Sequence, residues 1–430
     1  MAAHWRIGRR DDDRELSRSQ CQTGSMNGHS DVIVVGAGLA GLAPATRLVE
    51  AGQDIMIFEA GSQAGGRMRT DHIDGFQLDR GFHVFNPAYP EARGVLDLDA
   101  LDLHPFAPGI AVRDGARLHL LAHPIRSPQT ILQTLGGPGS LPTKLAVARW
   151  LGETGFGPTA WIRKGGDSTL DAALNSRGIH GDLRKVMTQF LTGVLGEDQM
   201  ETSRRFTDML VRSFVRGRPS LPGEGIQAIP NQLASRLPEG VLRLNAPVRE
   251  VAAHSVTTDA GHFVGDRVIV ATDPRTAAVL TRAPTPAMRS VTTYYHRLQT
   301  PPPHARWLHI DLAPSGPVTN VAVVSAVAPG YAEQGVLVAS TVLGVHDQSL
   351  EPVDRRHASV ILGVSESTWT FIRHYAIVDA LPRQLPHQPM RRRESGGGGI
   401  LVAGDHRDTP SVQGALVSGR RVAEAVPATA

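Results

Sequence analysis

The chain has 430 residues, of which 41% are hydrophobic and 20% charged, and its formal net charge at pH 7 is +3. This composition is typical of a globular protein, and the length allows roughly two or three domains' worth of hydrophobic core. Because the net charge is small, the sequence gives no reason to expect a nucleic-acid partner. The single cysteine, Cys21, excludes an internal disulfide and fits a reducing compartment, so we expect a cytoplasmic protein.

We expect that the N-terminal region is neither a membrane anchor nor an export signal. Residues 1–30 are polar and charged without an apolar core, which excludes a signal peptide, and we predict that they form a disordered leader. Met26 precedes the first predicted strand, and we hypothesise that it is the natural start, which the mass of the native protein would test. No apolar run in the chain approaches the roughly 20 residues that span a bilayer, so we expect at most a peripheral membrane contact.

The most informative segment covers residues 31–60. It reads as a strand, a Gly-x-Gly-x-x-Gly turn, a helix, a second strand and an acid, with the key positions at Gly36, Gly38, Gly41 and Glu59. The first glycine permits a tight turn, the second lets backbone N–H groups approach a pyrophosphate, and the third lets the helix pack closely on the strand. The helix N-terminus would face the phosphates. The Glu59 carboxylate can bind a ribose diol and would repel a 2′-phosphate, so the segment predicts a site for FAD or NAD.

One residue of this segment departs from the expected pattern. Pro44 falls just beyond the first helical turn, where its ring can clash with a carbonyl of the preceding turn. We therefore expect the helix to begin late or to bend there.

Further segments distinguish FAD from NAD. The run Gly65-Gly66-Arg67 follows Glu59 after a short gap and suits a second phosphate contact and an approach to a flavin. The later segments are Leu78–His83, Leu221–Pro230, Leu244–Val251, and Gly399–Asp405 followed by Val412–Ala415. In this order and spacing, they resemble the superfamily of FAD enzymes that contains amine oxidases, protoporphyrinogen oxidases and phytoene desaturases. Glu224 and Ile226 depart from the commonest form of the Leu221–Pro230 segment.

The resemblance implies which residues contact FAD. They are Gly36, Gly38, Gly41, Glu59, Gly65, Gly66, Arg67, Gly81, Val248, Gly404, Asp405 and Val412. Gly81 would lie beside the isoalloxazine ring, the backbone of Val248 would bracket the adenine, and Asp405 would lie near the ribityl and phosphate groups. The helix after Pro410 would direct its N-terminus at the flavin, where it can stabilise negative charge. Because no cysteine lies near the C-terminus, we expect noncovalent FAD.

The same resemblance implies an α/β fold. A Rossmann-like FAD-binding domain of the glutathione reductase type would be interleaved with an α+β substrate domain that contains an antiparallel sheet. We place the FAD-binding domain at residues 31–90, 220–286 and 395–430, and the substrate domain at 91–219 and 287–394. Alternating apolar residues predict strands of that sheet at 306–312, 318–326 and 335–343.

The absence of two residue types from parts of the sequence narrows the class of reaction. Many amine oxidases of the superfamily place a lysine near flavin N5 and aromatic residues beside the C-terminal motif. This chain has no lysine after Lys185 and no aromatic residue after Tyr375. The desaturase-like branch remains, with hydride transfer from a C–H bond of an apolar or secondary-metabolite substrate to FAD. The alternatives are an amine- or porphyrinogen-type oxidase that releases hydrogen peroxide, and a redox-neutral isomerase or cyclase.

Candidate catalytic and substrate-binding residues follow from the motifs. We select His83 and His406 as bases, because an imidazole near the flavin can accept a proton near neutral pH. The alternative is that each only forms a hydrogen bond with the backbone or the flavin. Candidate cavity residues, with plain core as the alternative, are Phe85, Tyr295, Trp369 and Tyr375. No second Gly-x-Gly-x-x-Gly follows a strand, so electrons would pass to an external acceptor such as oxygen or a quinone. No residue cluster has metal-ligand spacing.

Overall fold

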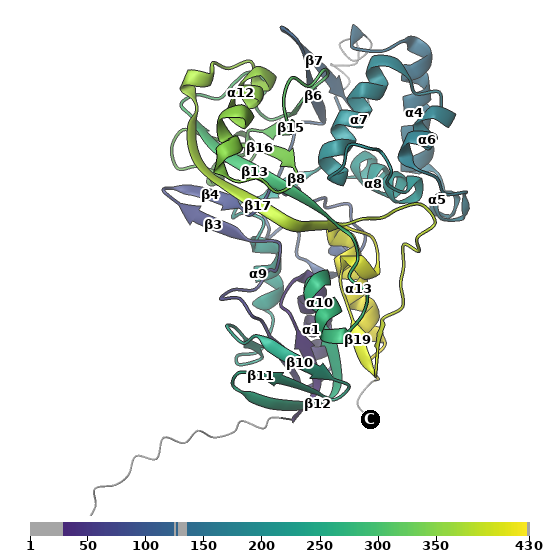
Figure 1. Cartoon of the computed structure of the whole chain (residues 1–430), viewed down its shortest axis with the longest axis vertical. Helices are drawn as coiled ribbons and strands as arrows, with labels where there is room; N and C mark the ends of the chain where they lie inside the picture. The colour runs from purple at the N-terminus through teal and green to yellow at the C-terminus, as the bar shows by residue number, and fades with distance from the viewer. Residues whose placement is uncertain (1–28, 124–125, 128–135, 428–430) are drawn as a thin grey trace, which may run out of the picture.

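The computed structural model describes residues 29–123, 126–127 and 136–427. Most of the predicted leader lies outside these ranges, and its last residues, His29 and Ser30, begin the first strand. Figure 1 shows one sheet with its helices in the lower part of the molecule, and a second sheet with a group of helices in the upper part. The chain passes between the two parts several times (Figure 1).

The first sheet has a parallel centre, with strands in the order β9, β2, β1, β12 and β19. Strand β11 pairs antiparallel with one end of β12, β10 pairs antiparallel with β11, and β18 pairs antiparallel with β19. Apolar runs such as residues 32–35 are buried on both faces, as parallel strands require. The strands are β1 His29–Val35, β2 Ile55–Phe58, β9 Leu242–Arg243, β10 Val248–Ala252, β11 Ser255–Thr258, β12 Gly261–Val270, β18 Ser395–Gly397 and β19 Ile400–Val402.

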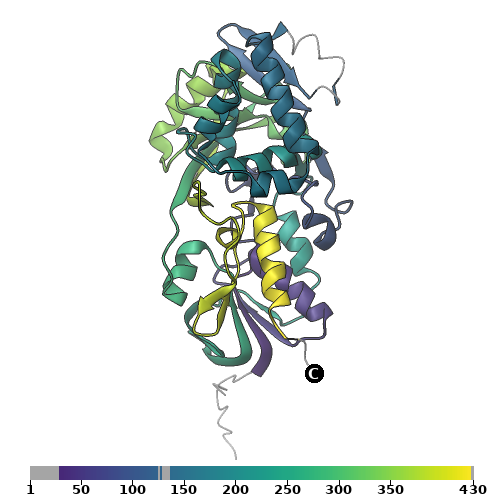
Figure 2. The same ribbon diagram turned by 90° about the vertical axis from the view of Figure 1, so that its right-hand side faces the viewer.

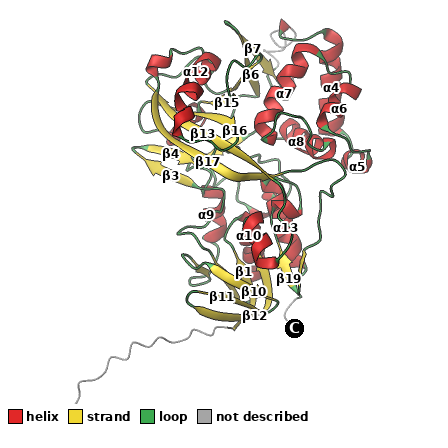
Figure 3. Ribbon diagram, viewed as in Figure 1, coloured by secondary structure: helices red, strands yellow, loops and turns green. Residues whose placement is uncertain are grey.

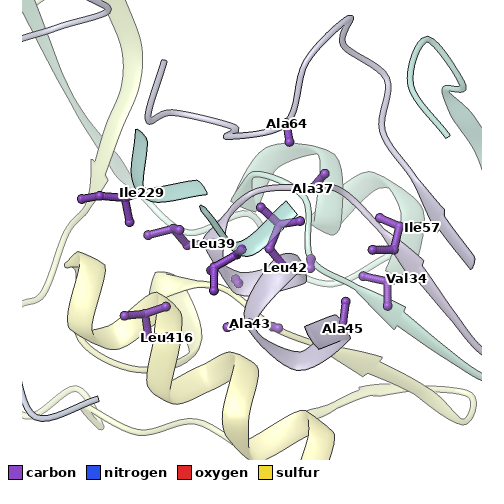
Figure 4. Close-up of a cluster of buried hydrophobic side chains, with 14 of the residues drawn as sticks. Val34, Ala37, Leu39, Leu42, Ala43, Ala45, Ile57, Ala64, Ile229 and Leu416 are labelled. Carbon is purple, nitrogen blue, oxygen red and sulfur yellow. The ribbon is translucent and has the colours of Figure 1, made fainter. Parts of the chain in front are cut away.

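Helices cover both faces of this sheet. On one face, α1 (Leu39–Glu50), α9 (Ala228–Ala234) and α13 (Val412–Glu424) pack on alternate residues of β1 and β2. Figure 4 shows this core, in which Val34 and Ile57 of the strands meet Leu42 of α1 and Leu416 of α13. On the other face, α10 (Pro274–Thr281) covers a second apolar cluster.

The helix α1 begins at Leu39, directly after Gly38, and continues through Pro44. The expected late start was therefore wrong. Pro44 has no N–H, so the Ala40 carbonyl lacks its usual helical hydrogen bond. That carbonyl lies against Gly419 of α13, and α13 lies beside α1 in Figure 2. Because Gly419 has no side chain, α13 leaves room for the Pro44 ring and for the Ala40 carbonyl oxygen.

We expect Gly419→Ala to destabilise the protein by about 1–3 kcal/mol, the usual cost of overpacking. A Cβ on Gly419 would lie 2.8 Å from Pro44 Cδ and 3.1 Å from the Ala40 carbonyl oxygen. The measurement is the midpoint of thermal unfolding. The control is Gly152→Ala in α4 (Leu141–Phe156), where an added Cβ meets nothing within 4 Å and should stabilise the helix slightly. Equal midpoints for both variants would show that α1 and α13 are not closely packed.

The second sheet has the order β17, β13, β16, β15, β14, β6 and β7, and only the β14–β6 pair is parallel within the described residues. One face is covered by α12 (Glu351–Leu362), which buries an apolar cluster on β15 and β16. The strands are β6 Gly109–Asp114, β7 Arg117–Ala122, β13 Met288–Leu298, β14 Leu308–Asp311, β15 Val318–Ala322, β16 Val336–Leu343 and β17 Thr370–Pro382.

A group of helices packs beside this sheet and shares a core with β6 and β14 (Figure 3). The helices are α4 Leu141–Phe156, α5 Thr159–Lys164, α6 Leu170–Ser176, α7 Gly181–Leu195 and α8 Arg204–Arg216. Within the described residues, no helix combines the length and apolar character that crossing a membrane requires.

Short elements connect the two parts. The strands β3 (Thr70–Ile73) and β4 (Phe76–Asp79) form a hairpin, and β5 (Leu103–Pro105) pairs with β8 (Ser220–Pro222). Two short helices are α2 (Ala92–Val95) and α11 (Val324–Val327). Single 3₁₀ turns occupy Pro329–Tyr331, Gln348–Leu350, Glu366–Thr368 and Asp405–Arg407.

The strands of each sheet come from separate sets of segments. Except for His29 and Ser30, the first sheet draws on the ranges that we predicted for the FAD-binding domain, and the second draws on those predicted for the substrate domain. The domain bounds themselves stay a prediction.

Candidate active site

The glycine-rich turn lies where β1 ends and α1 begins. Gly36 has φ +101°, and a Cβ on it would lie 2.9 Å from the Ala271 carbonyl oxygen. A Cβ on Gly41 would lie only 2.0 Å from the Gly36 carbonyl oxygen. Side chains at these two positions would therefore force β1, α1 and the end of β12 apart.

A second glycine pair faces this turn. Gly65 donates its N–H to the Ala37 carbonyl oxygen at 2.8 Å, which holds the Gly65-Gly66 doublet against the turn. A Cβ on Gly66 would lie 3.3 Å from Gly38 Cα, a tight contact, and Gly66 has φ +59°, so this position favours glycine. The adjacent N-terminus of α1 has no side-chain cap and no acidic residue in its first turn. Its N–H groups are thus available to an anion.

The acid at the end of β2 is held close to the same turn. Glu59 accepts hydrogen bonds from the N–H groups of Ala37 and Gly61, each at 2.8 Å. The Glu59 carbonyl oxygen accepts from the Ala246 N–H at 2.8 Å, which brings the start of β10, and with it Val248, beside the acid. These groups gather at the carboxyl ends of the parallel strands, where ligands bind in such sheets.

An ion pair joins the first and last motifs. Arg67 Nη2 lies 2.7 Å from Asp405 Oδ1, and Arg67 Nη1 donates to the Ala380 carbonyl oxygen at 2.7 Å. Burial lowers the pKa of Arg67, but the carboxylates of Asp405, Asp273 and Asp379 together raise it above the ordinary value. Gly404, with φ +155°, makes the turn after β19 and donates its N–H to Ser418 Oγ.

A large cavity lies beside the helices of the upper part of the molecule. Its volume is about 760 Å³, and it is lined by residues of α4, α7 and α8 and of β6 and β7. Residues 82–84 and Val412, the first residue of α13, reach the same cavity. The predicted flavin-facing segments therefore border a space large enough for an organic substrate.

The lining of this cavity is mainly apolar. Its aromatic members are Phe82, Tyr89, Phe106, Phe156, Phe190, Phe206 and Phe214. Within the described part of the chain, no Asp or Glu lines it, and its cationic members are Arg126, Lys144, Arg218 and Arg289. The cavity thus suits an uncharged or partly anionic molecule better than a cation.

His83 lines the cavity with a defined tautomer. Its Nδ1 lies 2.9 Å from the Gly81 carbonyl oxygen. Because a carbonyl oxygen only accepts, Nδ1 carries the proton and the Nε2 lone pair is left to accept another. Burial lowers the pKa of His83, and the nearby Asp79 carboxyl only partly opposes this. The imidazole is therefore neutral near pH 7.

His406 lies elsewhere. It is buried beside α10, where it lines a small depression with Arg392 and Arg407, and it is not among the described residues that line the large cavity. Burial lowers its pKa to about 4, although Asp405 opposes the shift. The structure therefore does not bring the two candidate bases together in one cavity.

The predicted cavity aromatics pack into the core. Phe85 is buried beneath α1, and Trp369 is buried against α12. The hydroxyl of Tyr295 donates to the Asp79 carbonyl oxygen at 2.9 Å, and that of Tyr375 donates to Asp71 Oδ2 at 2.8 Å. None of the four is among the described residues that line the large cavity.

Apart from His83 and Val412, the residues that line the cavity were not identified from the sequence. Phe190 on α7, and Phe206 and Phe214 on α8, belong to segments without a motif. Their spacing indicates an apolar helix face, which is also what a closed core produces. No signal in the sequence separates the two cases.

The model of the family described as flavin containing amine oxidoreductase matches residues 39–427. The chain belongs to this family. Putrescine oxidase from Kocuria rosea is 27% identical over 352 residues, which cover 75% of this chain and 70% of that enzyme. Hydroxysqualene dehydroxylase from Sinorhizobium fredii is 26% identical over 300 residues, which cover 63% and 69%.

A solved structure shows the same fold. An oxidoreductase from Methanosarcina mazei is similar with a TM-score of 0.73 and 17% identity, covering 92% of this chain and 100% of that one. The predicted superfamily, the α/β fold and the FAD cofactor are thereby confirmed. This family member is an FAD-dependent oxidoreductase.

The residues present fit FAD. The facing backbones of Gly38 and Gly66 leave a cradle that one Cβ would narrow, and the uncapped N-terminus of α1 opens onto it. The Glu59 carboxylate lies beside the same turn and can accept from a ribose diol. Asp405, at the other end of the site, is buried with Arg67 as its partner. The individual contacts stay predictions.

Proposed function

We propose that this flavin oxidoreductase dehydrogenates an apolar, secondary-metabolite-type substrate rather than an amine. The observation that carries the proposal is the large cavity beside His83, which is lined by apolar residues and cations and by no carboxylate among the described residues. An alkylamine is a cation near pH 7 and would lose its hydration there without gaining a counterion. An apolar molecule incurs no such cost and buries its surface favourably.

The roles of the chain's own residues follow from their positions. FAD, when bound, supplies the oxidising group that takes two electrons and a hydrogen from a substrate carbon. The cavity walls hold the substrate and exclude water. His83 Nε2 accepts the proton that leaves the neighbouring carbon, and the N-terminus of α13 at Val412 stabilises negative charge in the same cavity.

The proposal also includes the electron acceptor and the cellular location. Oxygen or a quinone would reoxidise the noncovalent cofactor. The cytoplasmic location is inferred from the single cysteine and the absence of an apolar spanning run in the sequence.

The test follows the oxidised-flavin band of the anaerobic, FAD-loaded protein in the visible spectrum. We expect a polyene or another apolar hydrocarbon to bleach the band, whereas putrescine and benzylamine leave it unchanged. Readmitting oxygen then shows whether oxygen is the acceptor, because only an oxygen-reactive enzyme regains the band without a quinone.

A pair of variants shows whether the cavity is the site. Met187→Trp narrows the cavity from α7 and should slow bleaching by the apolar substrate at least about tenfold, through lost proximity. Val279→Trp, on the exposed face of α10, should leave it unchanged. If amines alone bleach the flavin band, the proposal is wrong and the protein is an amine oxidase. If the band persists with every compound, a redox-neutral reaction is favoured.

A further inference from the structure

One end of the large cavity holds positive charge at the surface of an apolar space. Arg126, Arg218 and His123 all line the cavity. Arg126 and His123 belong to one turn after β7, since the Arg126 N–H donates to the His123 carbonyl oxygen at 3.1 Å. The guanidinium of Arg126 donates to the carbonyl oxygens of Val215, at 2.8 Å, and of Gly217, directly before Arg218.

No described carboxylate neutralises the charge of this cluster. In the part of the chain that the structure describes, Arg126 and Arg218 form no ion pair with a carboxylate, and the undescribed residues 124–125 and 128–135 contain no Asp or Glu. Burial lowers the pKa of Arg126, and the nearby positive charge of Arg218 lowers it further. The two cations thus repel each other beside an apolar wall.

The third member of the cluster has an unused polar atom. His123 Nδ1 is buried and has no hydrogen-bond partner among the described residues. An unpaired buried nitrogen costs free energy unless a ligand satisfies it. Burial, and then Arg126, lower the pKa of His123, so a neutral ring can offer one N–H to an anion near pH 7.

The remaining arginine of the cavity provides an internal comparison. Arg289 also lines the cavity, but its guanidinium lies 3.3 Å from Glu201 and 3.7 Å from Glu197. Among the described residues, Arg289 therefore has carboxylate counterions, whereas Arg126 and Arg218 have none.

The cluster and His83 line the cavity at different points. Ser220 pairs with Phe85 in an isolated antiparallel bridge, so Arg218 and His83 lie on opposite sides of that bridge. Arg218 is exposed as well as cavity-lining, which places it where the cavity meets solvent. A molecule held at the cluster can extend its apolar part along the cavity toward His83.

We propose that His123, Arg126 and Arg218 bind the anionic group, a carboxylate or a phosphate, of an amphipathic substrate whose apolar part fills the cavity. The inference rests on the proposed function, because it assigns a polar end to that same apolar substrate. Paired guanidinium groups bind such oxygens through charge-assisted, often bidentate hydrogen bonds. Binding the anion removes the repulsion between the two arginines and satisfies His123.

The test compares matched amphiphiles by titration calorimetry on the full-length, FAD-loaded protein. Dodecanoate is compared with methyl dodecanoate, and dodecyl phosphate with dodecanol, so the two arms separate carboxylate from phosphate recognition. We expect at least one anion to bind tenfold or more tightly than its neutral partner, and the difference to shrink as salt is raised.

Two variants test whether the side chains of the cluster cause the preference for the anion. Arg218→Gln should abolish the preference for the anion and leave the affinity for the neutral partner unchanged. Arg163→Gln, on the exposed side of α5, should keep the full preference. Arg218 is the better target because Arg126 also holds two backbone carbonyls, so its loss could disturb the fold.

The outcomes separate this inference from the proposed function. Equal affinity for anion and neutral partner in the unaltered protein would overturn the anion site and leave the apolar cavity intact. No binding of any of the four compounds would overturn both proposals. A preference that survives Arg218→Gln would also overturn the assignment to this cluster.

Discussion

Replacing Gly41 by alanine is expected to abolish FAD retention and to lower the stability of the protein severely. A Cβ at this position would lie 2.0 Å from the Gly36 carbonyl oxygen, 3.1 Å from the Gly36 carbonyl carbon and 3.2 Å from Ala271 Cβ. The nearest atoms belong to backbone and cannot rotate away, so α1 must move from the end of β1. That movement displaces the helix N-terminus that faces the phosphate site. The measurement is the flavin-to-protein absorbance ratio after gel filtration, together with the unfolding midpoint.

The control for this variant is Gly94→Ala. Gly94 lies in α2, where an added Cβ meets nothing within 4 Å, and the variant should keep both FAD and stability. If Gly41→Ala retained a full complement of FAD at the original midpoint, the close packing of α1 on β1 would not be a condition for binding the cofactor. Loss of FAD in both variants would show instead that retention is fragile for reasons unrelated to the turn.

The FAD-binding part of the molecule was predictable because close backbone contacts restrict which residue types can occupy its key positions. Gly36 and Gly41 are glycines since neighbouring backbone atoms occupy the place of a side chain. Glu59 is read from its place after a buried strand, and the structure indeed holds its carboxylate at the Ala37 N–H. Such requirements depend on local geometry, which a short motif specifies together with its spacing.

The substrate half was less predictable because the sequence does not say which apolar face borders a space. Tyr295 lies on β13 and Tyr375 on β17 of the second sheet. Their hydroxyl groups donate hydrogen bonds to Asp79 and Asp71 respectively, which are far away in the sequence. Those partners are fixed only by the packing of the β3–β4 hairpin on the sheet. Phe206 looks equivalent in sequence and yet borders the cavity.

The two histidines show how closeness in the chain can mislead. His406 directly follows the Asp405 motif, but the turn at Gly404 directs its ring toward α10. His83 follows Gly81, whose φ of +97° turns the chain so that its carbonyl oxygen meets the imidazole Nδ1. The motif placed both residues near the cofactor, and only the three-dimensional path of the chain decides which one faces the cavity.

We expect His83→Gln to lower kcat by a factor of about 10² or more, the usual contribution of a general base. The same variant should remove the acidic limb of the pH–rate profile. Burial lowers the pKa of His83 below its ordinary value of 6.5, so the neutral, proton-accepting form predominates above that pH. Activity of the unaltered enzyme should therefore approach a plateau above pH 6.5 and fall as the pH drops through the lowered pKa. The measurement is kcat for an apolar substrate across this range.

His406→Gln is the matched comparison, because His406 is also buried, and its pKa is likewise lowered, to about 4, but it lines a different depression. This variant should keep kcat within about twofold and preserve the acidic limb, since its imidazole does not reach the substrate. FAD content must be equal in all three proteins, so that a change in kcat reports proton transfer rather than lost cofactor. If His406→Gln loses the acidic limb and His83→Gln keeps it, the base is His406, and the reacting bond lies on the α10 side of Asp405.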